Sequence, residues 1–437
     1  MRQLYSLLFL VLLPLILLRL LFKSRGIKGY RQRWGERFSI FHPGLKPDVA
    51  PIWIHAVSVG ECEAAFPMAR RLLEIHPGLP LLMTCTTPTG SSRIRSVMGE
   101  RVLHVYLPYD LPWLASRFLT FFRPRLGIIM ETEIWPNLFA AAGSRHIPLV
   151  IANARLSEKS SRGYSRISSL VQPALTSIRA ILAQTQEDLD RYRLIGAEPG
   201  QLVLAGNLKY DLEWTPAMAK HSLELRGHLF GMRKVFIAGS THPGEEELVL
   251  QAFGNVLHKW PDTVLILVPR HPERSDSVRM LCDSLGYTSV LRTEARPVHE
   301  TEKVLIVNGV GELRSFYGTS DLAYIGGSLV PHGGQNPLEP LIQGIPVLFG
   351  PHMANFSQPK REILRAGAGQ EVRNVDELRD QILFLLDHPE EAQRMGLCGK
   401  QMIKANQGAL DRQIKHIECI LVPEGESSLE RKEFNLN

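Results

Sequence analysis

The chain has 437 residues, too many for a single hydrophobic core, so its length favours two domains. Hydrophobic residues make up 44% of it and charged residues 22%, an ordinary composition for a folded protein that excludes a disordered one. The formal net charge of +6 favours anionic partners: membrane lipid, nucleic acid or phosphorylated substrates. Its five cysteines include no Cys-x-x-Cys pair, which indicates a reducing compartment and argues against a structural zinc site.

The N-terminal stretch LYSLLFLVLLPLILLRLLF, residues 4–22, is apolar except at Tyr5, Ser6 and Arg19. Its length is near the lower end of the roughly 17 to 25 residues that a membrane-spanning helix needs. A signal peptide fits less well, because no small-residue cleavage site is visible and basic residues follow directly. The stretch therefore predicts a retained membrane anchor, either spanning the membrane or lying in its interface, with a buried helix as the weaker alternative.

A basic strip follows within and after this stretch, opposed only by Glu36, and consists of Arg19, Lys23, Arg25, Lys28, Arg31, Arg33 and Arg37. Arg2 is the only charge before the apolar run. By the positive-inside rule, this asymmetry predicts that the remainder of the chain lies in the cytoplasm. We expect the strip to contact anionic headgroups, and a nucleic-acid patch is the alternative.

Strand-like apolar runs alternate with helical segments in two series, separated by a polar interval near residues 212–232. The first series is 51–58, 79–86, 102–108, 126–131, 148–155, 180–185 and 202–207, and the second is 234–240, 263–270, 303–308, 322–328 and 345–350. Runs of this kind predict parallel sheets covered by helices on both faces. We expect an anchor segment at 1–37 and two doubly wound α/β domains, at 38–215 and 230–425, facing each other across a cleft. Ligands of such sheets bind beyond the carboxyl ends of the strands.

Charged side chains follow three of the predicted strands in the first domain. HAVSVGE ends in Glu61, with Glu63 two residues on, METEIWPN supplies Glu131 and Glu133, and GNLKYD supplies Lys209. Residues two apart on a helix do not share a face, so Glu61 and Glu63 cannot both point toward a ligand. Glu61 lies in the predicted first helical turn, where we expect the helix dipole to favour its ionised form.

The second domain contains the glycine-rich string GGSLVPHGGQNPLEP, residues 326–340. Glycine permits positive φ and close approach of the backbone to a ligand. Asn336 opens a predicted helix with Pro337 at its first position and Glu339 three residues on, which is the pattern of a capping box. The same segment is also suited to cradle a phosphate at the helix N-terminus, and its glutamate to accept hydrogen bonds from a ribose. The spacing alone leaves these interpretations open.

Two further strand ends in this domain are polar. GSTHPGEEE places His242 before a helix start, and PRHPER places Arg270 and Arg274 after a strand, where Arg270 is suited to meet a phosphate. NGVGELRS comes close to the dinucleotide fingerprint G-x-G-x-x-G but carries Arg314 in place of the third glycine, so it is weak evidence for NAD.

Metal chemistry has little support in the sequence. The one Asp-x-Asp, Asp188 and Asp190, falls in a helical segment, and we expect both side chains to be solvated rather than to hold a metal. No cluster of histidines and cysteines suggests a transition-metal site either. We therefore expect no metal and no cofactor.

Taken in order, the anchor, HAVSVGE, METEIWPN, GNLKYD, PRHPER, GGQNPLEP and GPHMANF resemble the 3-deoxy-D-manno-octulosonic acid (Kdo) transferases of lipopolysaccharide biosynthesis over nearly the whole chain. That resemblance implies a GT-B glycosyltransferase with two Rossmann-like domains and no required metal. It implies CMP-Kdo as the donor, bound mainly by the second domain, and the lipid A precursor tetraacyldisaccharide 1,4'-bisphosphate as the acceptor. It also implies the cytoplasmic side of the inner membrane, with membrane lipid but no nucleic acid as a partner.

The resemblance assigns roles residue by residue. The family's general base falls on Glu61, and positions associated with stabilising the transition state fall on Glu131 and Lys209. The CMP contacts fall on Pro269, Arg270, Gly311, Glu312, Leu313, Asn336, Pro337, Leu338 and Glu339. One departure is Asn308-Gly309, where the family pattern has Asp-Thr before the Gly-Glu pair.

Two alternatives stand beside this hypothesis. A nucleotide-sugar 2-epimerase of the same fold also pairs glycine-rich loops with carboxylates, but it would need no lipid anchor, so residues 1–37 discriminate between the two. A membrane-tethered protein that binds a nucleotide without catalysis is the other.

Overall fold

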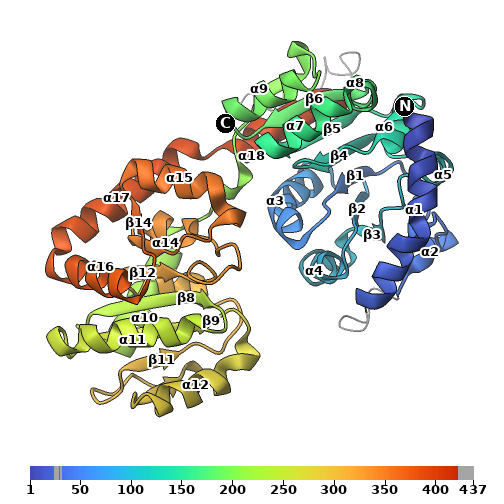
Figure 1. The fold of residues 1–437 in the computed structure, drawn as a ribbon. Helices are drawn as coiled ribbons and strands as arrows, with labels where there is room; N and C mark the ends of the chain where they lie inside the picture. Colours follow the sequence, from blue (N-terminus) through green and yellow to red (C-terminus); the bar gives the residue numbers. More distant parts are fainter. Residues whose placement is uncertain (24–28, 30–31, 422–437) are drawn as a thin grey trace. The chain divides into compact units, whose positions relative to one another are not determined.

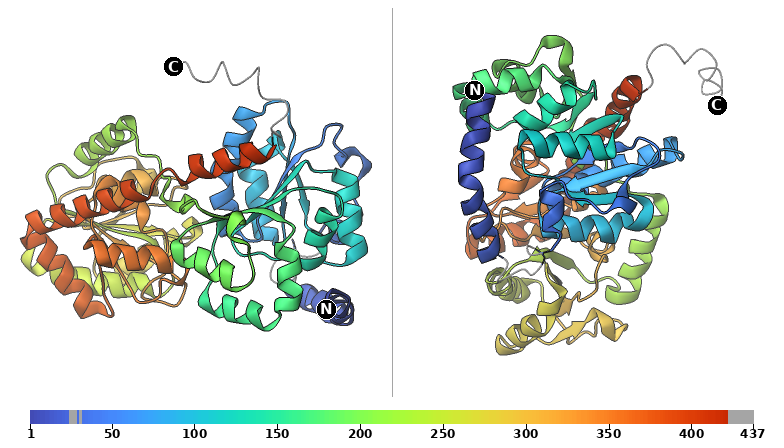
Figure 2. Two further views of the ribbon diagram at one scale, coloured as in Figure 1. Left: turned by 90° about the horizontal axis from the view of Figure 1, so that it is seen from above. Right: turned by 90° about the vertical axis from the view of Figure 1, so that its right-hand side faces the viewer.

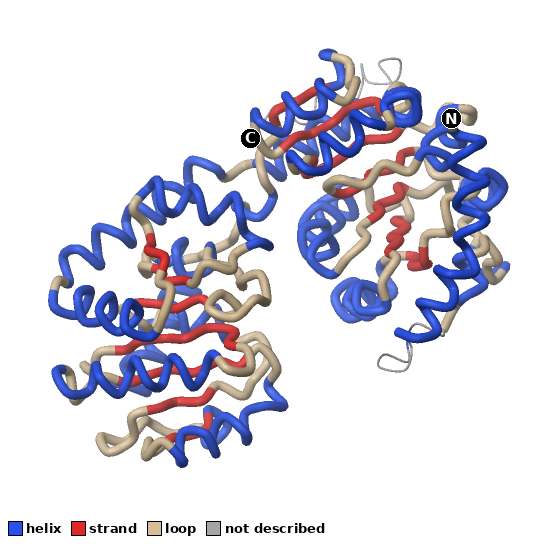
Figure 3. The backbone as a smooth tube through the Cα atoms, in the orientation of Figure 1, coloured by secondary structure: helices blue, strands red, loops and turns tan. Residues whose placement is uncertain are grey.

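The computed structural model describes residues 1–23, 29 and 32–421, which form two compact units (Figure 1). Unit 1 comprises Met1–Asp211 together with the C-terminal segment from Gln407, and unit 2 comprises Leu212–Asn406. Each unit contains a seven-stranded sheet whose paired strands are parallel, with helices on both faces (Figure 3). The predicted pair of doubly wound α/β folds is confirmed.

The sheet of unit 1 has the order β3-β2-β1-β4-β5-β6-β7, so the direction in which strands are added reverses between β1 and β4. Its strands are β1 (Ile52–His55), β2 (Leu81–Cys85), β3 (Leu103–Tyr106), β4 (Leu126–Met130), β5 (Leu149–Ala154), β6 (Ile178–Ala183) and β7 (Leu202–Leu204). The crevice at such a reversal, outside the carboxyl ends of the strands, is where doubly wound sheets bind ligands.

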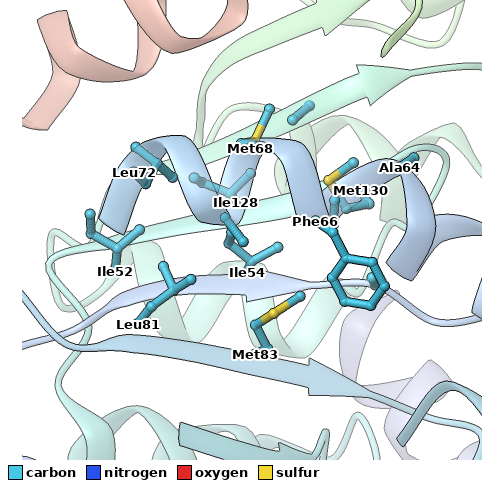
Figure 4. Close-up of a cluster of buried hydrophobic side chains, with 14 of the residues drawn as sticks. Ile52, Ile54, Ala64, Phe66, Met68, Leu72, Leu81, Met83, Ile128 and Met130 are labelled. Atoms are coloured by element: carbon cyan, nitrogen blue, oxygen red, sulfur yellow. The ribbon is translucent and has the colours of Figure 1, made fainter. Parts of the chain in front are cut away.

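The helices of unit 1 are α1 (Arg2–Lys23), α2 (Trp34–Arg37), α3 (Val59–Ile75), α4 (Pro88–Met98), α5 (Pro112–Phe122), α6 (Pro136–Gly143), α7 (Glu158–Arg166), α8 (Ser168–Leu175), α9 (Gln186–Leu194) and α18 (Ala409–Leu421). Alternate strand residues pack on opposite faces of the sheet. Ile52 and Ile54 pack under α3 with Phe66 (Figure 4), whereas Trp53 joins the core on the other face, with Phe118 of α5.

The sheet of unit 2 has the order β10-β11-β9-β8-β12-β13-β14, with the reversal between β8 and β12. Its strands are β8 (Val235–Thr241), β9 (Val264–Pro269), β10 (Ser289–Leu291), β11 (Val304–Ile306), β12 (Leu322–Ile325), β13 (Val347–Phe349) and β14 (Gly369–Glu371). Its helices are α10 (Pro216–Phe230), α11 (Glu245–Lys259), α12 (Ser275–Ser284), α13 (Leu313–Tyr317), α14 (Leu338–Gln343), α15 (Ser357–Ala366), α16 (Val375–Asp387) and α17 (Pro389–Asn406). Both units are thus doubly wound, but their strand orders differ: three strands lie on the β1 side of the first reversal, whereas four lie on the β8 side of the second, where β11 is inserted between β10 and β9.

Each of the predicted apolar runs contains a strand, and two strands were not predicted. These are β10 and β14, which are three residues long and lie at the two edges of the second sheet. An edge strand pairs on one side only, so it needs little apolar sequence, and the residues Gly-Gln-Glu of β14 carry no strand signal.

The C-terminal helix α18 belongs to unit 1, although the sequence suggested a second domain that continued to residue 425. It packs against α3 and β5 (Figure 2), where it buries Ile414 and Ile417. Gln413, which is fully buried, accepts the N–H of Asn153 at 2.9 Å and donates to the carbonyl of Gly206 at 3.1 Å. An amphipathic stripe indicates that a helix is covered, but not by which part of the chain.

The expected role of the basic strip at the membrane is wrong for two of its members. Arg37 is 5% exposed and donates to the carbonyl of Thr86 at 2.8 Å, and Arg33 donates to the carbonyl of His104 at 2.7 Å. Both guanidinium groups also lie over the ring of Tyr106. They hold the start of unit 1 together, which a charge count along the chain does not reveal. Arg25, Lys28 and Arg31 lie outside the described residues.

Candidate active site

Glu61 lies where β1 gives way to α3, at the point where the strand order of unit 1 reverses. Ser58 caps the helix with its hydroxyl, which accepts the N–H of Glu61 at 3.4 Å. The Glu61 carboxylate reaches back to accept the N–H of Val57 at 2.8 Å and the hydroxyl of Ser58 at 3.0 Å. This reciprocal capping holds the side chain at the carboxyl edge of the sheet.

The expectation that the surroundings of Glu61 favour its ionised form is wrong. Burial, together with the nearby carboxylates of Glu131 and Glu133, raises the pKa of the Glu61 carboxyl to about 7 against the hydrogen bonds from Val57 and Ser58. Desolvation and like charge therefore outweigh the helix dipole, because the side chain is turned toward other acids and away from water. A pKa near neutrality suits a proton acceptor.

Glu63 takes no part in this cluster. It is exposed on α3 and forms an ion pair with Arg93 of α4. The prediction that the two glutamates point in different directions is confirmed.

Glu131 follows β4, the immediate neighbour of β1, and adopts a φ of 58°. A left-handed conformation is costly for a residue with a side chain, and here the surrounding structure enforces it. The N–H of Glu131 donates to the carbonyl of Ala152 at 2.9 Å, and its own carbonyl accepts the hydroxyl of Tyr192 at 3.1 Å. The strained turn aims this carboxylate into the same edge as Glu61.

Lys209 completes the group from the far side of the sheet, in the 3-10 helix Leu208–Tyr210 that follows β7. Burial lowers the pKa of the Lys209 ammonium, an effect opposed by Glu131 and strengthened by Arg155. Lys209 thus interacts with Glu131, which interacts with Glu61. The structure brings together all three residues that were predicted to be catalytic.

The turn that carries Lys209 is held by groups that the sequence did not single out. The side chain of Asn153, in β5, accepts the N–H of Leu208 at 3.0 Å, and that of Asn207 accepts the N–H of Lys209 at 3.0 Å. Asp211 then accepts the N–H groups of Gly408 and Leu410, at 2.6 Å and 2.5 Å, at the start of α18. The string GNLKYD therefore also docks the C-terminal helix.

The expectation that Asp188 and Asp190 are both solvated is half wrong. Asp190 is exposed, but Asp188 is 3% exposed and accepts the N–H of Leu156 at 2.9 Å and the hydroxyl of Thr185 at 2.6 Å. It stabilises the start of α9 and the end of β5. Among residues 1–23, 29 and 32–421, no three His, Cys, Asp or Glu side chains are grouped so that they could hold a metal ion.

In unit 2, the loop that follows β12, residues 326–335, is called here the glycine loop. Gly326 approaches the β8 end so closely that a Cβ atom would clash with the carbonyl of Ser240, and Gly327 adopts a φ of 68°. The N–H groups of Gly334 and Gln335 close the loop on the carbonyls of Gly327 and Gly326, at 2.8 Å and 3.0 Å. The glycines therefore serve close packing within the loop.

A buried carboxylate holds the glycine loop in place. Glu245, the first residue of α11, is fully buried, and the N–H groups of Gly327, Ser328 and Leu329 donate to it at 2.6, 2.9 and 3.0 Å. The hydroxyl of Tyr324 and the N–H of His242 donate to the same carboxylate at 2.7 and 3.0 Å. These three loop N–H groups are engaged by the protein, so this part of the loop is not the phosphate cradle that the sequence allowed.

Sequence reasoning missed Glu245. It lies in a run of three glutamates, and acids in a first helical turn already have an ordinary explanation in the helix dipole. Which of the three glutamates is buried against the glycine loop is visible only in the folded chain, because that loop follows β12 and is distant from α11 in the sequence.

The segment from Asn336 to Glu339 does not form the predicted capping box, because Pro337 occupies the N-cap position and makes no side-chain cap hydrogen bond. The Asn336 side chain accepts the N–H of Leu338 at 3.1 Å and donates to the Glu339 carboxylate at 3.2 Å. Pro337 precedes α14 rather than beginning it, one residue from the predicted start. The pair forms a rigid polar corner at the end of the glycine loop.

His242 connects this corner with the loop after β9. Its Nε2 lies 3.1 Å from the amide nitrogen of Gln335, its ring stacks on that of His332 at 4.2 Å, and its centroid is 6.3 Å from that of His271. Arg270, which precedes His271, is exposed at the end of β9. Burial and the neighbouring His332 lower the pKa of His242, as do His271 and Arg270, against Glu245.

The arginines of PRHPER separate into two roles. Arg274 donates to both carboxylate oxygens of the buried Glu246, at 2.8 and 3.2 Å, and the Thr241 hydroxyl donates to the same carboxylate at 2.9 Å. The Arg274 side chain therefore has a structural role. Pro269 is the last residue of β9, and the N–H of Arg270 donates to the carbonyl of Thr241 at 2.9 Å, which leaves the guanidinium at the carboxyl edge.

The segment from Gly311 to Leu313 leads into α13, which packs beside α14. Gln343 of α14 donates to the carbonyl of Arg314 at 2.8 Å, so these predicted CMP contacts lie near Asn336 to Glu339. Glu312 forms an ion pair with Arg292 at 3.2 Å.

The departure at Asn308-Gly309 has a local structural explanation. A Cβ atom on Gly309 would collide with the carboxylate of Glu312, so a glycine leaves room for that side chain. The Asn308 amide donates to the hydroxyl of Thr293 at 3.0 Å, and its oxygen accepts the N–H of Thr293 at 3.3 Å. The Asn-Gly pair therefore fits its surroundings.

Comparisons with known proteins agree with this site. Residues 32–212 match the family model for 3-deoxy-D-manno-octulosonic-acid transferase (kdotransferase). The chain is 40% identical over 412 residues to a 3-deoxy-D-manno-octulosonic acid transferase of Haemophilus influenzae, covering 94% of this chain and 96% of that one. It is 33% identical over 439 residues to a transferase of the same description from Bordetella pertussis, covering 95% and 99%.

The fold is also that of a solved glycosyltransferase from Rickettsia africae, with a TM-score of 0.55, 14% identity, and coverage of 85% of this chain and 98% of that one. Such low identity shows the fold alone. The relatives described above match at much higher identity over nearly their whole length, which decides against the 2-epimerase alternative. The chain therefore belongs to the 3-deoxy-D-manno-octulosonic acid (Kdo) transferase family of glycosyltransferases, which acts in lipopolysaccharide biosynthesis.

Proposed function

We propose that this Kdo transferase moves Kdo from CMP-Kdo to a sugar hydroxyl of the lipid A precursor tetraacyldisaccharide 1,4'-bisphosphate, with inversion at the anomeric carbon. The observation that carries the proposal is the Glu61 carboxyl, half-buried at the strand-order reversal of unit 1 with its pKa raised to about 7. At neutral pH a large fraction of such a group is ionised, and its ionised form is basic enough to take a hydroxyl proton in the transition state.

The chemical step is a single displacement. Glu61 accepts the proton of the acceptor hydroxyl as that oxygen forms a bond to the anomeric carbon of Kdo. The bond between this carbon and the phosphate oxygen breaks, and CMP leaves with the bonding electrons. Attack from the face opposite CMP inverts the anomeric configuration.

Lys209 and Glu131 are proposed to act on charge that develops in this step. The buried ammonium of Lys209 can offset negative charge on the departing phosphate or on the Kdo carboxylate. Glu131 interacts with both Lys209 and Glu61. The Glu131 carboxylate favours the charged form of Lys209 and opposes ionisation of Glu61. Lys209 thus stays more cationic, and Glu61 becomes a stronger proton acceptor.

Unit 2 is proposed to bind the CMP portion of the donor. Arg270 presents its guanidinium at the end of β9, where it can pair with the phosphate. The corner formed by Asn336 and Glu339 presents acceptor oxygens suited to ribose hydroxyls. Pro269, Pro337 and Leu338 shape this site, and the turn of Gly311, Glu312 and Leu313 supplies backbone groups beside it.

The membrane is proposed to supply the acceptor. Helix α1 is long and apolar enough to cross a membrane, with a mean hydropathy of 2.5 over the most apolar 18-residue window of Arg2–Phe22. A chain with a formal net charge of +6 is attracted to anionic lipid and to a bisphosphorylated acceptor. We place both units on the cytoplasmic side of the inner membrane.

Incubation of the purified full-length chain in detergent with CMP-Kdo and the tetraacyldisaccharide bisphosphate tests this function. Mass spectrometry should show Kdo added to the lipid, with release of an equal amount of CMP. Consumption of CMP-Kdo without a Kdo-bearing lipid, or isomerisation of a nucleotide sugar, would contradict the proposal.

Metal independence is a separate part of the proposal. Arg270 and Lys209 can carry the charge of the donor phosphate, a role that a divalent cation fills in many other transferases. We expect Kdo transfer to proceed at an unchanged rate in excess EDTA. A loss of activity that Mg²⁺ or Mn²⁺ restores would show that a metal takes part.

A further inference from the structure

Helix α1 is covered along one face by the rest of unit 1. Its half-buried residues are Tyr5, Ser6, Phe9, Leu13, Ile16, Leu17 and Leu20, and the remaining side chains from Met1 to Phe22 are exposed. The half-buried positions recur every three or four residues, so they form one stripe that runs through all turns of the helix. A helix that only entered the unit at its C-terminal end would not show such a stripe.

The first turns of α1 are attached to unit 1 by specific contacts. The Asn137 amide of α6 donates to the hydroxyl of Ser6 at 3.0 Å, and the rings of Phe9 and Tyr109 lie 6.2 Å apart. Helix α1 runs beside α6 along the flank of the unit (Figure 1). The N-terminal end of the helix is therefore docked on the same unit as its C-terminal end.

A buried carboxylate supports this docking. Asp110 is 2% exposed and accepts the N–H groups of Asn137 and Leu138 at 3.1 and 2.8 Å. Burial raises the pKa of Asp110 to about 6, against these two hydrogen bonds and one with Tyr5. The first turns of α1 thus close over a polar group, which is not how a helix end surrounded by lipid is built.

The contacts of the first turns of α1 with Asn137 and Tyr109 cannot form if α1 spans the membrane. A helix of 22 residues is about 33 Å long, close to the thickness of roughly 30 Å of the hydrocarbon core. If α1 crossed the bilayer, Ser6 and Phe9 would emerge near the far surface. Asn137, Asp110 and the loops around them would then have to lie within hydrocarbon, where irregular backbone and a carboxylate are not tolerated.

We propose that α1 does not span the membrane but lies in the plane of the bilayer surface, with its covered stripe on unit 1 and its exposed face in the lipid. That face carries Leu4, Leu7, Leu8, Val11, Leu15 and Leu18, which are between 50% and 66% exposed. In this placement the exposed face contacts the boundary between the headgroups and the acyl chains of an anionic phospholipid bilayer.

The charges of α1 fit this placement. Arg2 and Arg19 are both exposed, one near each end of the helix. In a helix parallel to the surface, both guanidinium groups can reach headgroup phosphates at the same depth. The protein surface takes the place of the polar face that an isolated interfacial helix would need. The N-terminus then remains on the same side of the membrane as the two units.

This inference rests on the membrane location proposed above but not on the chemistry. Its first test is the topology of residue 3. Gln3→Cys is introduced in a chain that also carries Cys398→Ser and Cys419→Ser, the two native cysteines that are not buried. Spheroplasts of a bacterial host that produces this chain are treated with a membrane-impermeant maleimide, before and after detergent lysis.

The expected result is labelling of position 3 only after lysis, with the chain recovered in the membrane fraction before it. Labelling in intact spheroplasts would place the N-terminus outside and overturn the inference. Recovery of the chain in the soluble fraction would overturn it as well.

The second test is a matched pair of double variants in isolated membranes. Phe9→Cys with Tyr109→Cys is expected to form an intramolecular cross-link with a short bis-maleimide, because the two rings are neighbours. Leu8→Cys with Tyr109→Cys is the control, since Leu8 is 54% exposed on the other face. Equal cross-linking of the two pairs, or none in either, would contradict docking. Neither test depends on Kdo transfer, so failure of the proposed function remains distinguishable.

Discussion

Both units place a glutamate in the first turn of the helix that follows the central strand at the strand-order reversal, yet the two glutamates are in opposite states. Glu61, after β1, is half-buried and, within the part of the chain that the structure describes, accepts two hydrogen bonds, from Val57 and Ser58. Glu245, after β8, is fully buried and accepts five. The same position in two doubly wound units therefore differs in burial and in hydrogen bonding.

The number of donors decides which carboxylate is available for chemistry. Five donors satisfy the lone pairs of Glu245 and turn it into a support for the glycine loop. Glu61 has fewer donors and faces Glu131 and Glu133, so its ionised form is unfavourable and its affinity for a proton is high. In unit 1 the proposed role belongs to the carboxylate itself, whereas in unit 2 the carboxylate maintains the shape of the backbone around it.

The largest expected effect comes from removing the proton acceptor. Glu61→Gln should lower kcat for Kdo transfer by about 10³-fold, because general base catalysis contributes about 10² to 10⁴. CMP binding, measured by calorimetry, should be unchanged. Glu63→Gln is the matched control and should retain wild-type kcat, since Glu63 is exposed and paired with Arg93. Wild-type turnover in Glu61→Gln would remove Glu61 as the base.

Glu245→Gln tests whether the Glu245 carboxylate supports the glycine loop. An amide that donates toward the loop N–H groups should loosen residues 327–329 and raise the KM for CMP-Kdo by about 10-fold, as the loss of one or two buried hydrogen bonds does. The kcat at saturating donor should fall much less. Glu247→Gln, on the exposed side of the same turn, is the control. A fall in kcat with an unchanged KM would show that Glu245 does not act through the donor site.

The pH dependence of kcat gives a smaller but more specific effect. Only ionised Glu61 accepts a proton, so kcat should rise with pH and level off above about 7, the pKa of this group. Glu131→Gln removes a negative charge that raises this pKa, so the rise should move toward lower pH even though the maximal rate falls. A rise at the same pH in both proteins would mean that another group limits the rate.

The thermal stability of the protein should change least, and Glu61→Gln and Glu245→Gln should change it in opposite directions. The pKa of folded Glu61 lies above its ordinary 4.5, so its stabilising contribution is full below about 4.5 and is lost as the pH rises through about 7. Glu61→Gln stays neutral and should melt a few degrees above wild type at pH 8, with the difference vanishing in acid.

Glu245→Gln should instead be less stable than wild type by about 1–3 kcal/mol at pH 8, since buried N–H groups lose an acceptor. Thermal melts at several pH values, read by circular dichroism, check both variants. A higher melting temperature for Glu245→Gln at pH 8 would break the contrast between the two sites.

Much of the architecture could be predicted from the sequence, because apolar runs on both faces of a strand are a local signal. The strands missed were the short edge pair, β10 and β14, in which little is buried. The grouping of the three residues proposed to be catalytic was predictable for a similar reason. Glu61, Glu131 and Lys209 each follow a strand directly, and parallel strands bring their carboxyl ends to one edge.

The chain by itself thus determined the two doubly wound units, the apolar N-terminal helix and the different directions of the Glu61 and Glu63 side chains. The tertiary structure alone decided that Arg33, Arg37 and Asp188 face inward, that α18 returns to unit 1, and that Glu245 supports the glycine loop. It also decided that the pKa of Glu61 is raised. The physical reason is common to all of these. Burial, hydrogen-bond partners and neighbouring charges are set by segments distant in sequence, whereas periodicity and turn signals are set by neighbours along the chain.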